Sequence, residues 1–136
     1  SKKVNAEIFR IFENSDAIPV IAPIGVGRDG DTYNINADTA AGAIAEAVNA
    51  TKLLMLTDIA GVLDSDGQLI SEMSRAEAKE LFATDAITGG MIPKLETCMK
   101  ALENGVEAAH VLDGRIPHVL LLELFTADGT GTKIDA

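Results

Sequence analysis

The sequence predicts an α/β fold in which helices cover both faces of a mostly parallel sheet. Short apolar runs alternate along the chain with stretches whose apolar residues recur at helical spacing, and this alternation is typical of parallel sheets. Aliphatic residues must build the core, because hydrophobic residues make up 47% of the chain and aromatic residues only 4%. The length of 136 residues corresponds to a single domain, residues 1–136, with one core.

Four elements are expected in the first part of the chain. Apolar residues at helical spacing predict a helix over residues 4–12, and the apolar run 18–24 is typical of a buried strand. Residues 37–48 follow the i, i+3, i+4, i+7 rule of a helix, with small side chains that allow close packing. The apolar run 52–57 predicts a second buried strand.

Turn and capping signals define the second part of the chain. The Asp-Gly pair at 66–67 lies between apolar stretches and predicts a hairpin. Ser74 and Glu77 have the spacing of a capping box, which predicts a helix through residue 82. A further helix after residue 90 is expected to end at Gly105. The remaining pattern predicts a strand, a helix and a last strand, over residues 109–112, 118–125 and 132–134.

The charge of the chain limits its partners. A formal net charge of -10 argues against binding to nucleic acid or to an anionic membrane, so we expect neither partner. Anionic ligands must therefore meet locally placed positive groups. The polar residues 1–5 do not resemble a signal peptide, and no apolar run has the roughly 18 residues of a membrane span. We expect an intracellular protein, cytoplasmic or, if of plant-type origin, in an organelle stroma.

The run Gly25 to Gly30 fits the pattern G-x-G-x-x-G after an apolar run, which would suggest a dinucleotide site. That fingerprint must open a helix, whereas residues 29–32 have turn chemistry and residues 32–36 alternate like a strand. A glycine-rich hairpin is the better interpretation. The chain has no G-x-x-x-x-G-K-[ST] segment, so any phosphate binding is not of the P-loop kind.

Asn34, Asn36 and Asp38 form a polar group at the start of the predicted helix 37–48. Asn36 is a good N-cap, and Asp38 would lie in the first turn, where the helix dipole favours a carboxylate. Capping alone explains these two residues but leaves Asn34, one strand repeat earlier, unexplained. Capping and a functional role both remain open for this group.

Gly89 and Gly90 precede a predicted helix that carries Lys94 about one turn in. Backbone amides at such a start can bind phosphate, and the lysine ammonium can reach the same anion. Pro93 costs no hydrogen bond in the first turn and stiffens it. The alternative is a lysine that faces water, as most helical lysines do.

Residues 57–62 leave the carboxyl end of a predicted strand with polar groups and a glycine, which is where open α/β sheets bind ligands. A simple turn explains them equally well. Cys98, the one cysteine of the chain, lies inside a predicted helix and is interpreted as a small core residue rather than a nucleophile.

Taken together, these segments resemble the amino acid kinase family. The matching stretches are IPVIAPIG, YNINAD, LTDIAGVLD, ITGGMIPK and LLLELFTADGTGTKI, which extend from Ile18 to Ile134. The resemblance is nearest to members that phosphorylate the γ-carboxylate of N-acetyl-L-glutamate in arginine biosynthesis. It implies a three-layer αβα sandwich, like that of carbamate kinase, of which this chain is the C-terminal, nucleotide-binding half. The family's N-terminal half, with the acceptor lid and a second catalytic lysine, has no counterpart here.

The resemblance also implies roles for individual residues. Asp38 and Lys94 are similar to the family's catalytic residues, and Asn34 and Asn36 to residues that bind the acceptor. ATP with Mg²⁺ is the expected donor, and no side chain is assigned as a metal ligand. The expected nucleotide-binding residues are Thr57, Asp58, Gly61, Val62, Ile87, Thr88, Gly89 and Gly90.

An arginine effector site is the last implication. In members inhibited by arginine, the site lies near the C-terminal end of this half, and the motif match places His110, Glu123 and Gly129 on it. A homo-oligomer is expected, and this chain alone is expected to be inactive. The alternatives are a kinase of the family that acts on aspartate, glutamate, carbamate or a nucleoside monophosphate, or a fragment that binds nucleotide or arginine without catalysis.

Overall fold

The structure, a computed structural model, describes residues 4–84, 87, 89–126 and 129–136. Helices and strands are mixed along the whole chain, which confirms the α/β class. They follow one another as α1 (Glu7–Arg10), β1 (Ile24–Val26), β2 (Thr32–Asn34), α2 (Ala37–Val48), β3 (Lys52–Thr57), β4 (Glu72–Ser74), α3 (Arg75–Ala83), α4 (Met91–Glu103), β5 (Ala108–Asp113), α5 (Val119–Phe125) and β6 (Thr132–Asp135).

The main sheet contains four strands in the order β3-β5-β6-β4. β3 pairs with β5 in parallel and β4 pairs with β6 in parallel, whereas β5 and β6 are antiparallel. The sheet is therefore mostly parallel, as predicted. Thr57 at the end of β3 pairs with Asp113 at the end of β5, so the carboxyl ends of these two strands meet at one edge.

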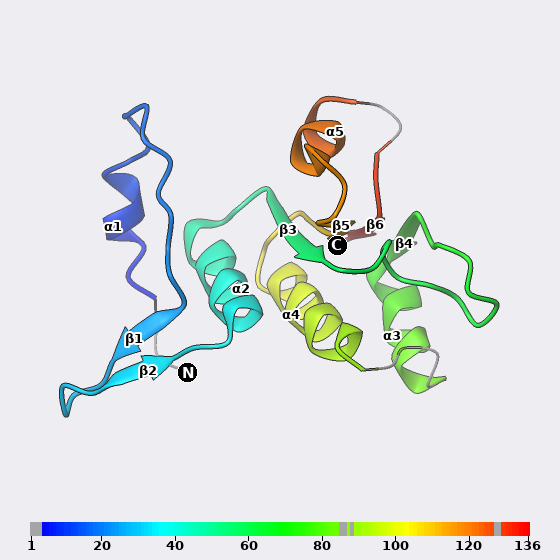
Figure 1. The fold of residues 1–136 in the computed structure, drawn as a ribbon, viewed down its shortest axis with the longest axis horizontal. Helices are drawn as coiled ribbons and strands as arrows, with labels where there is room; N and C mark the ends of the chain where they lie inside the picture. Colours follow the sequence, from blue (N-terminus) through cyan, green and yellow to red (C-terminus); the bar gives the residue numbers. More distant parts are fainter. Residues whose placement is uncertain (1–3, 85–86, 88, 127–128) are drawn as a thin grey trace.

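The helices cover the two faces of the sheet unequally. Figure 1 shows α2, α4 and α3 in a row on one side of the sheet and α5 alone on the other. Alternate strand residues point to opposite faces, and those on the three-helix side are buried, among them Met55 of β3 and Val111 of β5. On the α5 side, Leu56 of β3 remains 44% exposed. The predicted three layers are present, but the layer that α5 forms alone is thinner than the layer formed by α2, α3 and α4.

α2 begins at the cap that the sequence predicted. Asn36 Oδ1 accepts hydrogen bonds from the backbone N–H and the hydroxyl of Thr39, at 2.9 and 3.1 Å. Small side chains along α2 allow it to pack closely against α4, and the two helices lie side by side beneath the sheet (Figure 1).

α3 begins with the predicted capping box. Ser74 Oγ accepts a hydrogen bond from the N–H of Glu77 at 3.2 Å, and Glu77 Oε2 accepts one from the N–H of Ser74 at 2.7 Å. The backbone and hydroxyl donors of Ser74 lower the pKa of Glu77. α4 ends at Glu103, two residues before Gly105. Gly105 has a φ of +103°, a conformation that only glycine adopts without strain, so the helix ends where the sequence predicted.

β1 and β2 form the predicted glycine-rich hairpin, separate from the main sheet. The N–H of Gly27 donates to the Asp31 carbonyl at 2.8 Å, and Gly30 has a φ of +87°. The glycines are followed by a strand, so the dinucleotide interpretation is excluded.

One expectation about strands was wrong, and one strand was not predicted. Residues 18–23 do not form a buried strand: Ile18 is 87% exposed, Val20 is 94% exposed, and only Ile24 enters β1. No described strand pairs with this segment, and an apolar run becomes a buried strand only when neighbours supply hydrogen bonds and cover. β4 was not predicted, because three residues are too few to show a strand period. The first helix is a single turn, α1.

Candidate active site

Lys94 and Asp38 form an ion pair that joins the first turns of α4 and α2. Lys94 Nζ lies 2.9 Å from Oδ2 and 3.2 Å from Oδ1 of Asp38, although the two residues are 56 positions apart in the chain. Their side chains are 19% and 26% exposed, so the pair remains open to a ligand. Capping of α2 falls to Asn36, and the Asp38 carboxylate points to Lys94 instead. The structure thus brings the two predicted catalytic residues together.

Cys98 lies one helical turn after Lys94 and is fully buried. Burial raises the pKa of its thiol to about 12, and the nearby negative charge of Asp38 contributes to the increase. A thiol with this pKa is almost entirely protonated near neutral pH and is a poor nucleophile. Cys98 is therefore a core residue, as expected.

The start of α4 is open and lined by glycine. Gly89 and Gly90 are exposed, and a Cβ atom at either position would meet nothing within 4 Å. Gly89 has a φ of +59°, a conformation that favours glycine. Pro93 lies in the first turn, where its missing N–H costs no helical hydrogen bond. A phosphate could approach the exposed backbone of this glycine-lined helix start, close to Lys94.

A cavity of about 270 Å³ lies between residues 59–67 and the start of α4. Its lining includes three of the predicted nucleotide-binding residues, Gly61, Val62 and Ile87. The Val62 and Ile87 side chains are 1% and 7% exposed, and the N–H of Val62 already donates to Thr132 Oγ1 at 2.8 Å. These residues shape the cavity wall rather than offer polar contacts. Thr88 lies outside the described residues.

Thr57 and Asp58 lie at the carboxyl end of β3, where the Thr57 hydroxyl donates to Asp58 Oδ1 at 3.3 Å. Beside them, at the end of β5, is a pair that the sequence analysis missed. Asp113 accepts hydrogen bonds from the Arg115 guanidinium through both carboxylate oxygens, at 2.9 and 2.8 Å. These side-chain bonds, with the N–H of Arg115, lower the pKa of Asp113 to about 2. The available signal was a polar Asp-Gly-Arg sequence directly after a buried strand.

The predicted acceptor-binding residues are not gathered into a pocket. Asn34 ends β2 and is exposed, and its amide has no hydrogen-bond partner among the described residues. The amide of Asn36 is occupied by its capping role at Thr39. In this chain they lie on the segment that leads from the β1–β2 hairpin into α2, two and four residues before Asp38.

His110, Glu123 and Gly129 converge on the α5 side of the sheet. His110 Nδ1 lies 2.7 Å from Glu123 Oε1, and the two side chains are 2% and 8% exposed. The contact is close but not aligned as a hydrogen bond, and neither ring nitrogen has another partner among the described residues. Burial lowers the pKa of His110, which the Glu123 carboxylate partly opposes. Glu123 also accepts from the N–H of Thr130 at 2.8 Å, and the same carboxylate faces Gly129.

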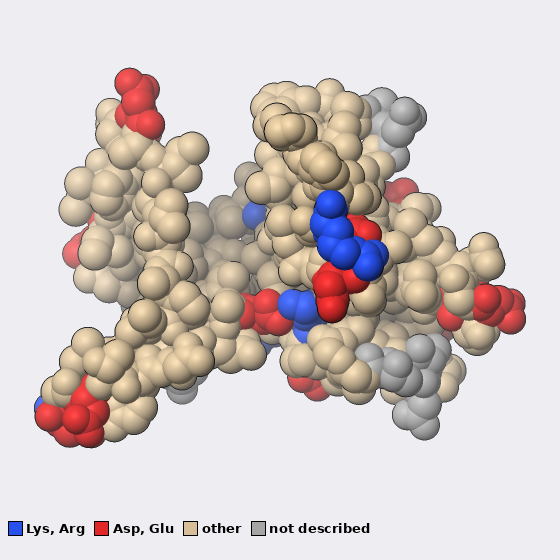
Figure 2. Space-filling model, viewed as in Figure 1, with Lys and Arg blue, Asp and Glu red and all other residues tan. Residues whose placement is uncertain are grey.

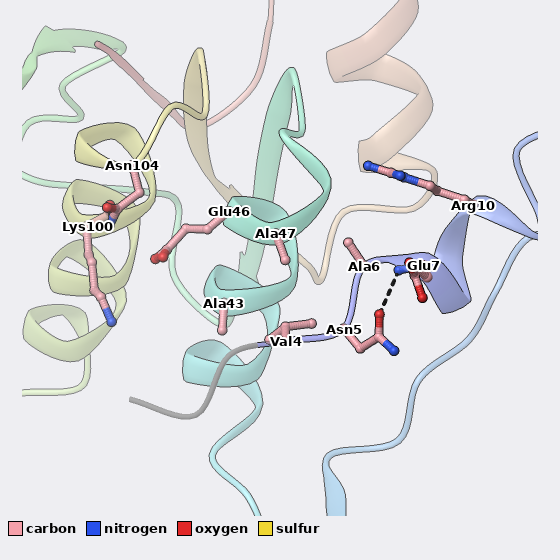
Figure 3. Close-up of a pocket in the computed structure, with 10 residues that line it drawn as sticks. All are labelled: Val4, Asn5, Ala6, Glu7, Arg10, Ala43, Glu46, Ala47, Lys100 and Asn104. Atoms are coloured by element: carbon pink, nitrogen blue, oxygen red, sulfur yellow. Dashed lines mark hydrogen bonds between the residues drawn. The ribbon is translucent and has the colours of Figure 1, made fainter.

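Another cavity, of about 820 Å³ and therefore larger than the one beside α4, contains none of the predicted site residues. Figure 3 shows its walls: the N-terminal segment that carries Asn5 and Glu7 on one side, and α2 and α4 on the other. Within the described part of the chain, no hydrogen bond or ion pair spans it; the one bond drawn joins the N–H of Glu7 to Asn5 Oδ1 within one wall. Size alone therefore does not identify the site.

The charged surface is locally mixed rather than uniform. Figure 2 shows basic and acidic side chains in contact near the centre of one face, with separate acidic clusters at the periphery. Two of the basic side chains lie in ion pairs with carboxylates, Lys94 with Asp38 and Arg115 with Asp113. In the residues that the structure describes, no helix is both long and apolar enough to cross a membrane.

Comparison with known proteins places these features in a family. The model of the amino acid kinase family matches residues 2–113. The acetylglutamate kinase of Parvibaculum lavamentivorans is 60% identical over 133 residues, which cover 98% of this chain but only 44% of that protein. This chain thus spans less than half the length of the curated relatives that it matches.

Solved structures agree with this assignment. The N-acetylglutamate synthase from Neisseria gonorrhoeae, complexed with coenzyme A and L-arginine, matches with a TM-score of 0.90 and 30% identity, over 98% of this chain and 31% of that one. The carbamate kinase from Giardia lamblia matches with a TM-score of 0.63 and 18% identity, over 80% of this chain and 36% of that one, which shows a common fold. From the match of the family model to most of its length, the identity to curated relatives and the shared fold, the chain belongs to the amino acid kinase family.

Proposed function

We propose that this chain supplies the nucleotide-binding half of an enzyme that transfers a phosphoryl group from ATP to the γ-carboxylate of N-acetyl-L-glutamate. The observation that carries the proposal is the Lys94–Asp38 pair beside the open, glycine-lined start of α4. A lysine ammonium and the positive end of a helix dipole would together supply the positive charge that a transferring phosphate needs. The identity to acetylglutamate kinases supports the choice of acceptor.

The proposed reaction needs no general base, because the acceptor is already a carboxylate. The barrier comes from the repulsion between two anions and from charge on the equatorial phosphoryl oxygens, so catalysis consists of positioning and electrostatics. Lys94 would stabilise the transferring group, and Asp38 would hold the lysine in place through both carboxylate oxygens. The loss of one such cation typically costs about 3 kcal/mol of transition-state stabilisation.

Mg²⁺ is the expected companion of the nucleotide. The described residues contain no group of three or more histidine, cysteine or acidic side chains that could hold a metal ion. Mg²⁺ commonly binds through substrate phosphates with one or two carboxylates, so we expect it to enter with ATP, where it neutralises phosphate charge. We also propose that the enzyme is a homo-oligomer located in the cytoplasm.

The test is a chimera in which this chain replaces the matched 133-residue stretch of the Parvibaculum lavamentivorans enzyme. We expect ATP-dependent formation of an acyl phosphate from N-acetylglutamate, trapped with hydroxylamine, and little product from aspartate, glutamate or carbamate. Lys94→Ala should lower kcat about a hundredfold while changing the KM for ATP less. Lys79→Ala is the matched control, because Lys79 of α3 forms an exposed ion pair with Glu103 at the far end of α4. A folded chimera without activity would contradict the proposal.

The proposal extends to regulation by L-arginine at His110, Glu123 and Gly129. These residues converge around one buried carboxylate, and a carboxylate is the natural partner of a guanidinium. The match to a synthase whose structure contains L-arginine supports this choice of effector. In this chain His110 already occupies one oxygen of Glu123, so arginine would have to compete with the histidine for it.

Arginine sensitivity is measured in the same chimera. Millimolar arginine should inhibit it, and Glu123→Gln should raise the concentration needed for half inhibition at least about tenfold. The amide keeps the size of the side chain and an oxygen for the N–H of Thr130, so a change reports the lost charge. No response to arginine, or a response that Glu123→Gln leaves intact, would remove this part of the proposal while leaving the kinase assignment standing.

A further inference from the structure

α2 and α4 approach each other closely at Gly42 and Thr97, about one helical turn below the Lys94–Asp38 pair. Gly42 follows Asp38 by four residues and Thr97 follows Lys94 by three, so the contact and the ion pair lie on the same faces of the two helices. A Cβ atom at position 42 would lie 2.5 Å from Thr97 Cγ2. Only glycine permits this separation of the helices.

Thr97 cannot easily turn away from position 42. Its hydroxyl donates a hydrogen bond to the Pro93 carbonyl at 2.9 Å, and the hydroxyl and the methyl share one Cβ atom. Rotating the methyl aside would therefore break this bond. A methyl group added at position 42 would instead push α2 away from α4, by about 1 Å to restore an ordinary carbon contact.

We infer that Gly42 is a positioning residue for the phosphoryl transfer, because it sets the spacing that holds Asp38 against Lys94. The two contacts of Lys94 Nζ, at 2.9 and 3.2 Å, leave little room before they exceed hydrogen-bond distance. The kinetic consequence rests on the proposed function. The spacing of the helices does not, and it can be measured in this chain alone.

Cys98 gives a readout that needs no catalysis. It is the one cysteine of the sequence, follows Thr97 directly, is fully buried, and its thiol has a pKa raised to about 12 by burial. A thiol reagent such as dithiobis(nitrobenzoate) should therefore react slowly with the chain. Gly42→Ala should raise this rate at least about tenfold by separating the helices, and Thr97→Ser in the same chain should reverse the increase. Serine lacks the methyl that clashes but keeps the hydroxyl for Pro93.

Gly105→Ala is the matched control. It makes the same chemical change at a φ of +103° with no neighbour within 4 Å of the added atom, so it strains the backbone without touching α2. For Gly105→Ala, the increase in the Cys98 reaction rate should be no larger than its loss of unfolding free energy in urea explains. For Gly42→Ala, the increase should be larger than its own loss of unfolding free energy explains. If Gly42→Ala folds only when Thr97→Ser is also present, that rescue supports the same clash.

In the chimera, Gly42→Ala should lower kcat about tenfold or more with the KM for ATP within about threefold, and Thr97→Ser should restore kcat. Gly105→Ala should leave kcat unchanged. An unaltered Cys98 rate in Gly42→Ala, an increase that Thr97→Ser does not reverse, or a normal kcat beside an exposed Cys98 would each overturn the inference. An inactive parent chimera would contradict the proposed function instead. The thiol assay would still test whether Gly42 sets the distance between α2 and α4.

Discussion

Asp38 and Asp113 show how neighbouring groups give different roles to two carboxylates. Asp38 lies in the first turn of a helix, where a dipole already favours its charge, yet both of its oxygens contact Lys94. Asp113 is held by the guanidinium and the N–H of Arg115, directly beside the end of β3. One carboxylate thus holds a lysine at the start of a helix, and the other holds an arginine at the strand ends.

Asp38→Asn separates a catalytic role from a purely structural one. We expect kcat of the chimera to fall about tenfold or more, because Lys94 loses its charged partner, while the melting temperature moves little. A partly exposed ion pair contributes only about 1 kcal/mol or less to stability, and asparagine keeps the size of the side chain. Glu46→Gln, on the last turns of the same helix, is the control. A lower melting temperature with normal kcat would favour the structural role.

Asp113 predicts a specific dependence of stability on pH. Its pKa in the folded chain is about 2, below the ordinary value of 3.8, so the unfolded chain takes up the proton first as the pH falls. The stabilisation is therefore complete above about pH 4 and is lost as the pH falls toward 2. In urea unfolding, the difference between the wild type and Asp113→Asn should shrink over this range. Asp16→Asn makes the same chemical change at an exposed carboxylate outside the helices and strands and is the control.

At the scale of elements, the sequence was most informative where local chemistry decides the structure. The Asn36 cap, the Ser74–Glu77 capping box and the Gly105 stop each depend on residues within one turn, and all three were found as predicted. The prediction of a buried strand over residues 18–24 was wrong because a strand depends on partners elsewhere in the chain. Likewise, spacing identified Lys94 and Asp38 as candidates, but only the packing of α2 on α4 brings them together.

Ser74→Ala tests how far α3 depends on its cap. The change removes the Oγ that accepts from the N–H of Glu77 and donates to its carboxylate, so we expect a loss of about 1 kcal/mol of unfolding free energy. Ser71→Ala makes the same change at an exposed hydroxyl just before β4 and should cost less. If Ser74→Ala and Ser71→Ala lose the same unfolding free energy in urea denaturation, the capping box contributes little to stability.

For the whole molecule, the uneven covering of the sheet is the dominant feature. The core lies between the sheet and α2, α3 and α4, whereas α5 leaves Leu121 and Phe125 exposed at 55% and 80%. The β1–β2 hairpin also has exposed apolar side chains, among them Val26, which is 74% exposed. Large apolar side chains that are exposed at several neighbouring positions of one element are typical of faces that other protein surfaces cover. The matched stretch is 44% of the acetylglutamate kinase of Parvibaculum lavamentivorans, so that relative is more than twice as long as this chain.

The activity of this chain alone follows from the same arrangement. The cavity beside α4 and the open helix start are built within the chain, so we expect it to bind ADP or ATP with Mg²⁺ weakly, as titration calorimetry would detect. Phosphoryl transfer also requires a bound acceptor, yet Asn34 is exposed and Asn36 is occupied by its cap. Turnover should therefore be negligible beside the roughly 1 to 100 per second of ordinary kinases, and should appear when this chain is joined to the remaining sequence of a relative. A chain that reached about 1 per second by itself would show that every part of the catalytic arrangement lies within these residues, contrary to the half-enzyme proposed.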